Sequence, residues 1–226
     1  MADKALASKL QYTNVTANAT QQMIERHCET AAACGFNAVM LQPCWIGMAR
    51  EILRGTAVRV ASAIAYPLGG ETTEMKVALA RSVVALGADE FDFQPNIGFL
   101  RSGMLQEFSE EMRLIVEAAD GRPVKSMSEF GFLTREERIL CITLAEEAGV
   151  AYVKNSSGVG PGGSPATPED IRFIRSHLKG RTGIKASGGI RSYEQAEALV
   201  QAGADLIGSS AAPDIVSHAT AASIAY

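Results

Sequence analysis

The stretch AEEAGVAYVK, residues 145–154, decides the fold. An Ala-rich segment with helical composition ends at Gly149, and a short run of apolar and β-branched residues follows at once. A glycine just past a helix can take the left-handed backbone conformation at little cost. The stretch therefore predicts a helix that passes directly into a strand.

The same junction recurs along the whole chain. Its glycines are Gly35, Gly55, Gly87, Gly121, Gly149, Gly183 and Gly203. Strands that alternate regularly with helices form a parallel sheet. A first strand near residues 11–14 brings the number of strands to eight, which favours a TIM (β/α)8 barrel with a short extra N-terminal helix. A doubly wound open sheet with more strands than usual is the alternative.

Local signals place the helix starts and argue for one domain. Asn18 or Thr20 precedes a helix, Thr134 with Glu137 forms a capping box, and Thr167 precedes a proline at the first helical position. The Gly- and Pro-rich residues 158–168 suit a long loop between a strand and a helix. With 226 residues and no linker, residues 1–226 are predicted to form a single barrel.

Composition excludes several classes of function. The 21 basic and 25 acidic residues give a net charge of −4 without a long basic run, so nucleic acid is not expected as a partner. The four cysteines lack metal-site spacing, which predicts free thiols and neither zinc nor a disulfide framework. No leader pattern and no apolar run of about 18 residues is present, so we expect a cytoplasmic protein without membrane contact.

Charged residues near the ends of predicted strands are candidates for chemistry, because a barrel of this type carries its active site there. Alternation along residues 90–94 places Glu90, Asp92 and Gln94 on one face and two phenylalanines on the other. The aromatic face suits the helix layer. Asp92 is then expected to point into the barrel, where a carboxylate must be paired or functional.

Two lysines are predicted to lie side by side at the ends of neighbouring strands. Lys154 ends the sixth predicted strand and Lys185 lies in the seventh. A neighbouring positive charge and partial burial both favour a neutral amine, which is the nucleophilic form that attacks a carbonyl. Lysines at strand ends also extend toward solvent or pair with carboxylates, which is the structural alternative. Lys125 on the fifth strand is a third interior charge, and we expect Glu129 to neutralise it.

Small residues follow the last two predicted strands. Gly188 and Gly189 come after the seventh strand, and Ser209 and Ser210 come after the eighth and are expected to begin the last helix. These loops often form a phosphate site in this fold, since small residues let backbone N–H groups approach an anion. Ordinary turns have the same composition.

Several of these segments resemble the deoxyribose-phosphate aldolase family. The resemblance rests on GADEFDFQPNIGFLRSG, VKNSSG, IKASGGIRS and GADLIGSS, with FNAVMLQP, AIAYPLGG and PVKSMSEFGFLTREE in the same order, so it covers nearly the whole chain. It implies that Lys154 forms a Schiff base, that Lys185 perturbs the pKa of Lys154, and that Asp92 transfers protons through water. It also implies a phosphate near Gly158, Gly188, Gly189, Ser209 and Ser210.

The implied reaction is the reversible cleavage of 2-deoxy-D-ribose 5-phosphate to D-glyceraldehyde 3-phosphate and acetaldehyde. The implied partners are small aldehydes and sugar phosphates, without a metal or another cofactor. A homodimer is a further expectation, since barrels of this kind are often dimers.

The chain also departs from the family pattern. Family members usually carry Asp-His-Thr on the first strand, where this chain has Gln11-Tyr12-Thr13, and a large or basic residue where it has Val159. A class I aldolase with a different donor or acceptor is therefore an alternative. Some relatives use a C-terminal tyrosine in proton transfer, so Tyr226 is a further candidate beside an ordinary solvated tail.

Two functions outside the aldolases use the same fold. A phosphosugar isomerase or epimerase needs a phosphate site and an acid/base pair, but no nucleophilic lysine. A silent sugar-phosphate sensor needs the phosphate site alone. Neither requires Lys154, Lys185 and Asp92 together, and so the three residues favour an aldolase.

Overall fold

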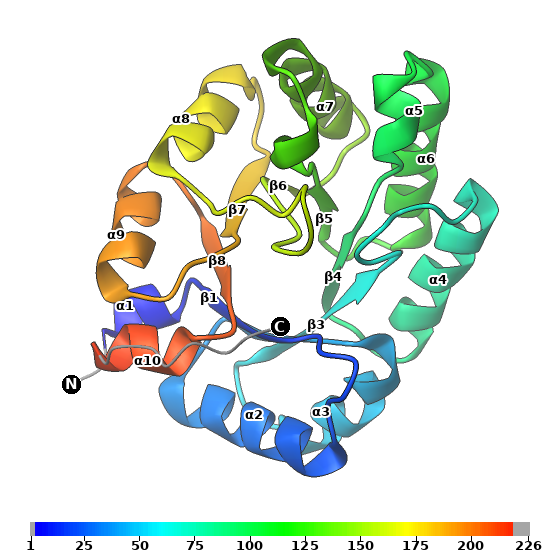
Figure 1. The fold of residues 1–226 in the computed structure, drawn as a ribbon. Helices are drawn as coiled ribbons and strands as arrows, with labels where there is room; N and C mark the ends of the chain where they lie inside the picture. Colours follow the sequence, from blue (N-terminus) through cyan, green and yellow to red (C-terminus); the bar gives the residue numbers. More distant parts are fainter. Residues whose placement is uncertain (1–2, 219–226) are drawn as a thin grey trace.

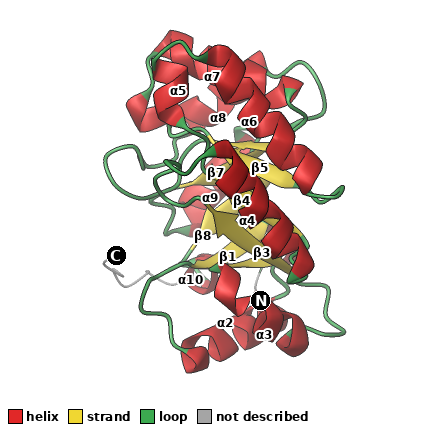
Figure 2. Cartoon of the chain, turned by 90° about the vertical axis from the view of Figure 1, so that its right-hand side faces the viewer, coloured by secondary structure: helices red, strands yellow, loops and turns green. Residues whose placement is uncertain are grey.

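Eight parallel strands form a closed barrel in the computed structural model, which describes residues 3–218 (Figures 1 and 2). The strands pair in chain order, and β8 closes the ring against β1. They are β1 (Leu10–Asn14), β2 (Ala38–Leu41), β3 (Arg59–Ile64), β4 (Glu90–Phe93), β5 (Val124–Met127), β6 (Tyr152–Lys154), β7 (Gly183–Ser187) and β8 (Leu206–Ser209). The predicted TIM barrel is confirmed, and the open sheet is excluded.

Helices surround the barrel, and Figure 1 shows them as an outer ring. The extra N-terminal helix is present as α1 (Lys4–Ala7). The other helices are α2 (Gln21–Cys34), α3 (Ile46–Ile52), α4 (Thr73–Ala85), α5 (Ile97–Arg101), α6 (Leu105–Ala118), α7 (Arg135–Glu147), α8 (Pro168–His177), α9 (Tyr193–Gln201) and α10 (Ala212–Ser217), with 3-10 turns η1 (Pro43–Trp45) and η2 (Phe130–Phe132). No helix within residues 3–218 is both long and apolar enough to cross a membrane.

The predicted helix starts are confirmed where the caps are local. Thr20 caps α2 with its side chain, Thr134 and Glu137 form the capping box of α7, and Thr167 caps α8 with a proline directly after it. Each cap supplies an acceptor to an N–H group that has no partner within its helix. The expected loop also forms, because residues 155–167 connect β6 to α8 without a regular element.

Two local predictions are wrong. Six of the seven junction glycines have a positive φ, but Gly183 instead begins β7, because α8 already ends at His177 and residues 178–182 intervene. The last helix begins at Ala212 and not at the serines. Ser209 ends β8, and its hydroxyl donates to the carbonyl oxygen of Ile190 at 2.7 Å and accepts from the N–H of Ala211 at 3.0 Å.

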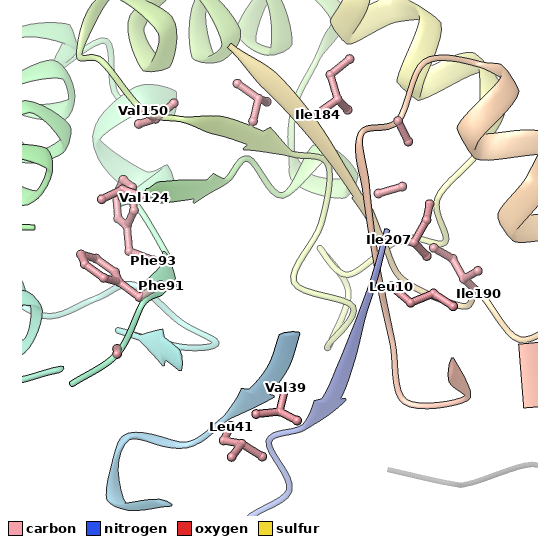
Figure 3. Packing of buried hydrophobic residues seen from close by; sticks show 14 of the residues in the cluster. Leu10, Val39, Leu41, Phe91, Phe93, Val124, Val150, Ile184, Ile190 and Ile207 are labelled. Atoms are coloured by element: carbon pink, nitrogen blue, oxygen red, sulfur yellow. The ribbon is translucent and has the colours of Figure 1, made fainter. Parts of the chain in front are cut away.

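The apolar core lies between the strands and the helices. Phe91 and Phe93 of β4 point away from the barrel interior and pack in this layer, as the alternation predicts (Figure 3). Val153 and Ile184 extend the same layer on β6 and β7. Since successive side chains of a strand face opposite sides, the residues between these apolar ones point into the barrel. The outer core therefore fixes which side chains form the interior.

One buried ion pair lies outside the barrel. Lys76 of α4 donates to both carboxylate oxygens of Glu111 on α6, at 3.0 and 2.9 Å, and neither side chain is exposed. Glu111 also accepts the N–H of Asn96 at 2.8 Å. Burial lowers the pKa of Lys76 and raises the pKa of Glu111, and their mutual attraction opposes both shifts. The pair thus ties two helices to the loop that follows β4.

Removal of one member of this pair is expected to be costly. Lys76→Met should lower the free energy of unfolding by about 3–5 kcal/mol, because it leaves a buried carboxylate without its counter-ion. The double variant Lys76→Met/Glu111→Gln should recover part of that loss, since a neutral amide still accepts from Asn96. Denaturant titration measures both values. The exposed pair Arg113–Glu110 is the matched control, and Arg113→Met should cost much less than Lys76→Met, because solvent screens both charges. Equal losses at Lys76 and Arg113 would contradict the prediction.

Candidate active site

Three lysines and two carboxylates meet inside the barrel. Lys154 and Lys185 lie directly opposite each other in the register of β6 and β7, as predicted from their strands. Asp92 and Lys125 lie opposite each other in the register of β4 and β5. The alternation of side chains turns all four toward the barrel axis, so residues from four strands reach one another.

Asp92 is the centre of this cluster. Its Oδ2 accepts from the ammonium group of Lys185 at 2.6 Å and from that of Lys154 at 3.1 Å. Lys125 approaches its Oδ1 to 3.4 Å. The side chain of Asp92 is completely buried. One carboxylate therefore contacts three amines, which explains how charged groups persist in the interior.

Glu90 is the second carboxylate of the cluster. Its Oε2 lies 2.9 Å from Nζ of Lys125, and Arg59 approaches the same oxygen to 3.8 Å. Its Oε1 accepts from the amide of Gln11 at 2.7 Å. The expectation that Glu129 neutralises Lys125 is wrong. Lys125 reaches the carboxylates of the neighbouring strand β4, whereas Glu129 lies beyond the end of β5 and accepts the N–H of Ser157.

The cluster shifts the pKa values of its members. Burial alone would raise the pKa of Asp92, but Lys185, Lys154 and Lys125 outweigh it and hold that pKa well below its usual range. Burial lowers the pKa of Lys185 to about 7, with Lys154 and Lys125 adding to the shift and Asp92 opposing it. For Lys125, Glu90 and Asp92 overcome the effect of burial and raise the pKa. Lys185 can therefore exchange a proton near neutral pH.

Exposure distinguishes the three lysines. The side chain of Lys154 is 7% exposed, against 1% for Lys185 and none for Lys125. Lys185 is also held more firmly, since it donates to Gln11 at 2.6 Å as well as to Asp92. Among the residues that the structure describes, Lys154 donates to Asp92 alone, at the longest of these distances. Lys154 is thus the amine that an aldehyde can reach with the least rearrangement.

A pocket of about 270 Å³ lies at the ends of β6, β7 and β8. Its lining includes all five residues that the sequence suggests for a phosphate: Gly158, Gly188, Gly189, Ser209 and Ser210. Gly208 also lines the pocket, and a Cβ atom there would lie 3.1 Å from Cε of Lys185. The pocket therefore adjoins the lysine cluster, and a side chain at position 208 would press on Lys185.

Three residues that line this pocket have backbone N–H groups with no protein acceptor within residues 3–218. Among the described residues, the N–H groups of Gly188, Gly189 and Ser210 donate no hydrogen bond. The N–H of Gly158, in contrast, donates to the hydroxyl of Ser156 at 2.9 Å. Free N–H groups around a concave surface favour an anion. Gly188 has φ +104°, and a Cβ there would lie 2.6 Å from the carbonyl oxygen of Ser164, so only glycine fits.

Three residues of this region do not follow from the sequence pattern. Arg191 lines the pocket as its only charged residue within residues 3–218, and its position two residues after the glycine pair was an available signal. Asn155 joins β6 to β7, because its side chain donates to the carbonyl oxygen of Ser187 at 3.0 Å and accepts the N–H of Ser187 at 2.9 Å. Gln11 bridges Lys185 and Glu90. Tyr226 lies outside the described residues.

The chain is similar to known aldolases over most of its length. No family model matches the chain. The deoxyribose-phosphate aldolase of Dictyoglomus turgidum is 41% identical over 211 residues, which cover 93% of this chain and 95% of the relative. That of a Geobacillus species is 39% identical over 217 residues, covering 96% of each. The tetrameric deoxyribose phosphate aldolase structure from Aeropyrum pernix superposes with a TM-score of 0.87 at 30% identity, covering 95% of this chain and 90% of that one.

The negative charge of Asp92 is expected to keep the pKa of Lys185 higher than it would be without that charge. In Asp92→Asn the attraction to the carboxylate disappears while the repulsion from two lysines remains, so the pKa of Lys185 should fall below its value of about 7. A pH titration followed by NMR of isotope-labelled lysine side chains measures the change. Arg175→Gln, which breaks an exposed ion pair with Asp205, is the control and should leave that pKa in place. An unchanged pKa in Asp92→Asn would contradict the electrostatic explanation.

Proposed function

The chain belongs to the deoxyribose-phosphate aldolase family, and we propose that it cleaves 2-deoxy-D-ribose 5-phosphate reversibly through a Schiff base on Lys154. This makes it an aldehyde-lyase of class I, whose products are acetaldehyde and D-glyceraldehyde 3-phosphate. One observation carries the proposal: the most accessible of three clustered lysines is Lys154, and it shares the carboxylate of Asp92 with Lys185.

The covalent step begins at Lys154. Its neutral amine attacks C1 of the open-chain aldehyde, a carbinolamine forms, and loss of water leaves a protonated imine. Lys185 is suited to donate the proton that the departing hydroxyl needs, because its pKa of about 7 lets both protonation states coexist near neutrality. Asp92 holds both amines in place at hydrogen-bonding distance.

Cleavage then breaks the bond between C2 and C3. The hydroxyl on C3 loses its proton and becomes the carbonyl of D-glyceraldehyde 3-phosphate, while the electron pair moves to the imine and gives an enamine. Protonation of the enamine at C2 and hydrolysis of the imine release acetaldehyde and restore Lys154. We assign the proton transfers to Lys185 and Asp92, working through water where the distance requires it.

The phosphate is assigned to the pocket beside the cluster. Gly188, Gly189 and Ser210 offer free N–H groups, and Arg191 supplies a positive charge at the rim. Ser209 and Gly158 line the same pocket and complete the set. The pocket adjoins Lys185 through Gly208, so a phosphate held here leaves the other end of a five-carbon sugar directed toward the lysines.

The proposal also includes the location and the assembly of the protein. A cytoplasmic enzyme fits the four cysteines, none of which is paired. We propose a homodimer, supported by exposed apolar side chains such as Leu68 and Met75, which are 86% and 56% exposed. Small-molecule aldehydes and sugar phosphates are the partners.

A borohydride trap tests the covalent step. Incubation with acetaldehyde and sodium borohydride should add an ethyl group to Lys154, because reduction converts the imine to a stable secondary amine. Peptide mass spectrometry locates the added mass. Lys154→Leu should lose the adduct and lower kcat by at least about a thousandfold, since the nucleophile is absent.

The same trap separates the rival functions. An isomerase, an epimerase or a sensor would give no adduct, and turnover of a sugar phosphate without an adduct would reject the aldolase mechanism. Lys179→Leu, at a surface loop away from the cluster, is the matched control and should keep both the adduct and the activity. Repeating the trap with ketones identifies an aldolase with a different donor.

Arg191 should affect phosphorylated substrates selectively. Arg191→Gln is expected to raise KM for 2-deoxy-D-ribose 5-phosphate about fivefold, as a partly exposed ion pair contributes about 1 kcal/mol. KM for 2-deoxy-D-ribose, which has no phosphate, should change little. Steady-state kinetics on both substrates measures the difference, with the exposed Arg54→Gln as control. Equal increases for both substrates would show that Arg191 does not contact the phosphate.

A further inference from the structure

We propose that Glu129 is a positioning residue for the β6–α8 loop, residues 155–167, and that it thereby sets the affinity for the phosphorylated substrate. Within residues 3–218, Glu129 forms no ion pair with the clustered lysines and does not line the pocket, and the reaction described above does not use it. The choice of substrate in this inference rests on the proposed function. The contacts of Glu129 with the loop are independent of that function.

The backbone around Glu129 holds the strand end that carries Lys154. The N–H of Ser128 donates to the carbonyl oxygen of Lys154 at 2.8 Å, and the N–H of Phe130 donates to that of Asn155 at 3.0 Å. These two bonds continue the pairing of β5 with β6 beyond the ends of both strands. Glu129 lies between the two donors, and so its side chain starts next to the peptide that follows Lys154.

The carboxylate of Glu129 reaches two separate parts of the loop. One oxygen accepts the N–H of Ser157. The other oxygen faces Gly162, where an added Cβ would lie only 2.9 Å from it. Positions 157 and 162 lie at the start and in the middle of the loop. The side chain of Glu129 therefore lies close to both the start and the middle of the loop.

This arrangement is costly in two ways. Glu129 has φ +43°, a left-handed conformation that a residue with a side chain rarely adopts. Its side chain is also buried, at 3% exposure for the residue, and burial raises its pKa against the opposing effects of the Ser157 hydrogen bonds and the charge of Lys154. Glycine would relieve both costs. A strained and buried carboxylate that bonds a loop at the site suggests a functional constraint.

The loop that Glu129 holds forms one wall of the phosphate pocket. Ser157, Gly158, Val159, Gly163 and Pro165 line the pocket from this side. The far end of the loop meets the opposite wall, since the N–H of Ala166 donates to the carbonyl oxygen of Gly188 at 2.9 Å. Figure 1 shows the loop between β6 and α8 extending over the barrel opening. Release of the loop at Ser157 would change the pocket and leave the lysine cluster in place.

Glu129→Ala tests this role. We expect KM for 2-deoxy-D-ribose 5-phosphate to rise by about tenfold or more, because the buried hydrogen bond from Ser157 that orders the wall is lost. The borohydride adduct of Lys154 with acetaldehyde should still form, since acetaldehyde has no phosphate. Hydrogen exchange of the peptide covering residues 155–163, followed by mass spectrometry, should become faster by a similar factor.

Glu129→Gln and Glu146→Ala are the matched variants. Glutamine keeps an oxygen that accepts from Ser157, so it should recover most of the affinity that alanine loses, and it serves where alanine impairs folding. Glu146 of α7 accepts the N–H groups of Lys179 and Gly180, both at 2.9 Å, in the loop that leads into β7 at the opposite end of the barrel. Glu146→Ala should lower the melting temperature without changing KM.

Three results would overturn the inference. One is a folded Glu129→Ala protein with the KM and hydrogen exchange of the wild type. Another is loss of the acetaldehyde adduct in that variant, which would place Glu129 in the covalent step. The third is a Glu129→Gln protein as weak in binding as the alanine variant, which would assign the effect to charge. Absence of turnover and of adduct in the wild type would instead reject the proposed function, and the exchange measurement still tests the loop.

Discussion

The site depends on an imbalance of buried charge. Lys125, Lys154 and Lys185 enter the barrel interior, where Glu90 and Asp92 are the carboxylates that contact them. Each buried ammonium needs a counter-charge, because desolvation otherwise penalises the charged form strongly. Glu90 and Asp92 together keep Lys125 protonated, which leaves Asp92 as the shared counter-charge of the other two lysines. One of those two must therefore give up its proton readily, and the pKa of Lys185 at about 7 expresses that shortage. The same deficit thus gives Lys185, the neighbour of Lys154, the ability to exchange a proton near neutral pH.

The barrel makes this deficit tolerable. Alternation along β4 directs Phe91 and Phe93 into the helix layer, and their burial fixes the direction of Asp92 between them (Figure 3). A shift of one residue would exchange the aromatic rings and the carboxylates, so the apolar layer resists it. Register then brings Lys154 opposite Lys185. The energy that holds the charges together thus comes mainly from apolar packing outside the barrel, and the ion pairs determine protonation more than stability.

Features that depend on strand alternation and on the order of strands could be predicted from the sequence. Features that depend on the contacts of single side chains could not. The barrel, the inward Asp92 and the facing lysines follow from alternation and from the order of strands, and all three are observed. The partner of Lys125 cannot be predicted in this way, because strand alternation assigns both Glu90 and Glu129 to the inward face. Only the direction of the chain beyond β5 shows that Glu90 is the partner. Gly183 resembles a helix-ending glycine in the sequence, yet the five residues after α8 place it in β7. The amide bridges of Gln11 and Asn155 span strands far apart in sequence, and no local pattern marks them.

Gln11 shows how one neutral side chain contributes to the imbalance. It accepts from Lys185 at 2.6 Å and donates to Glu90 at 2.7 Å, so it satisfies both groups without adding charge. A carboxylate at this position would give the three lysines a third counter-ion, and its attraction would raise the pKa of Lys185. It would also repel Glu90, which now receives a hydrogen bond from the same place. An amide therefore serves the site in two ways, since it fixes the position of Lys185 and preserves the charge deficit that releases a proton. The change in the first strand is compatible with the proposed chemistry. Gln11 orients Lys185 by accepting a hydrogen bond, and an uncharged amide oxygen can accept that bond.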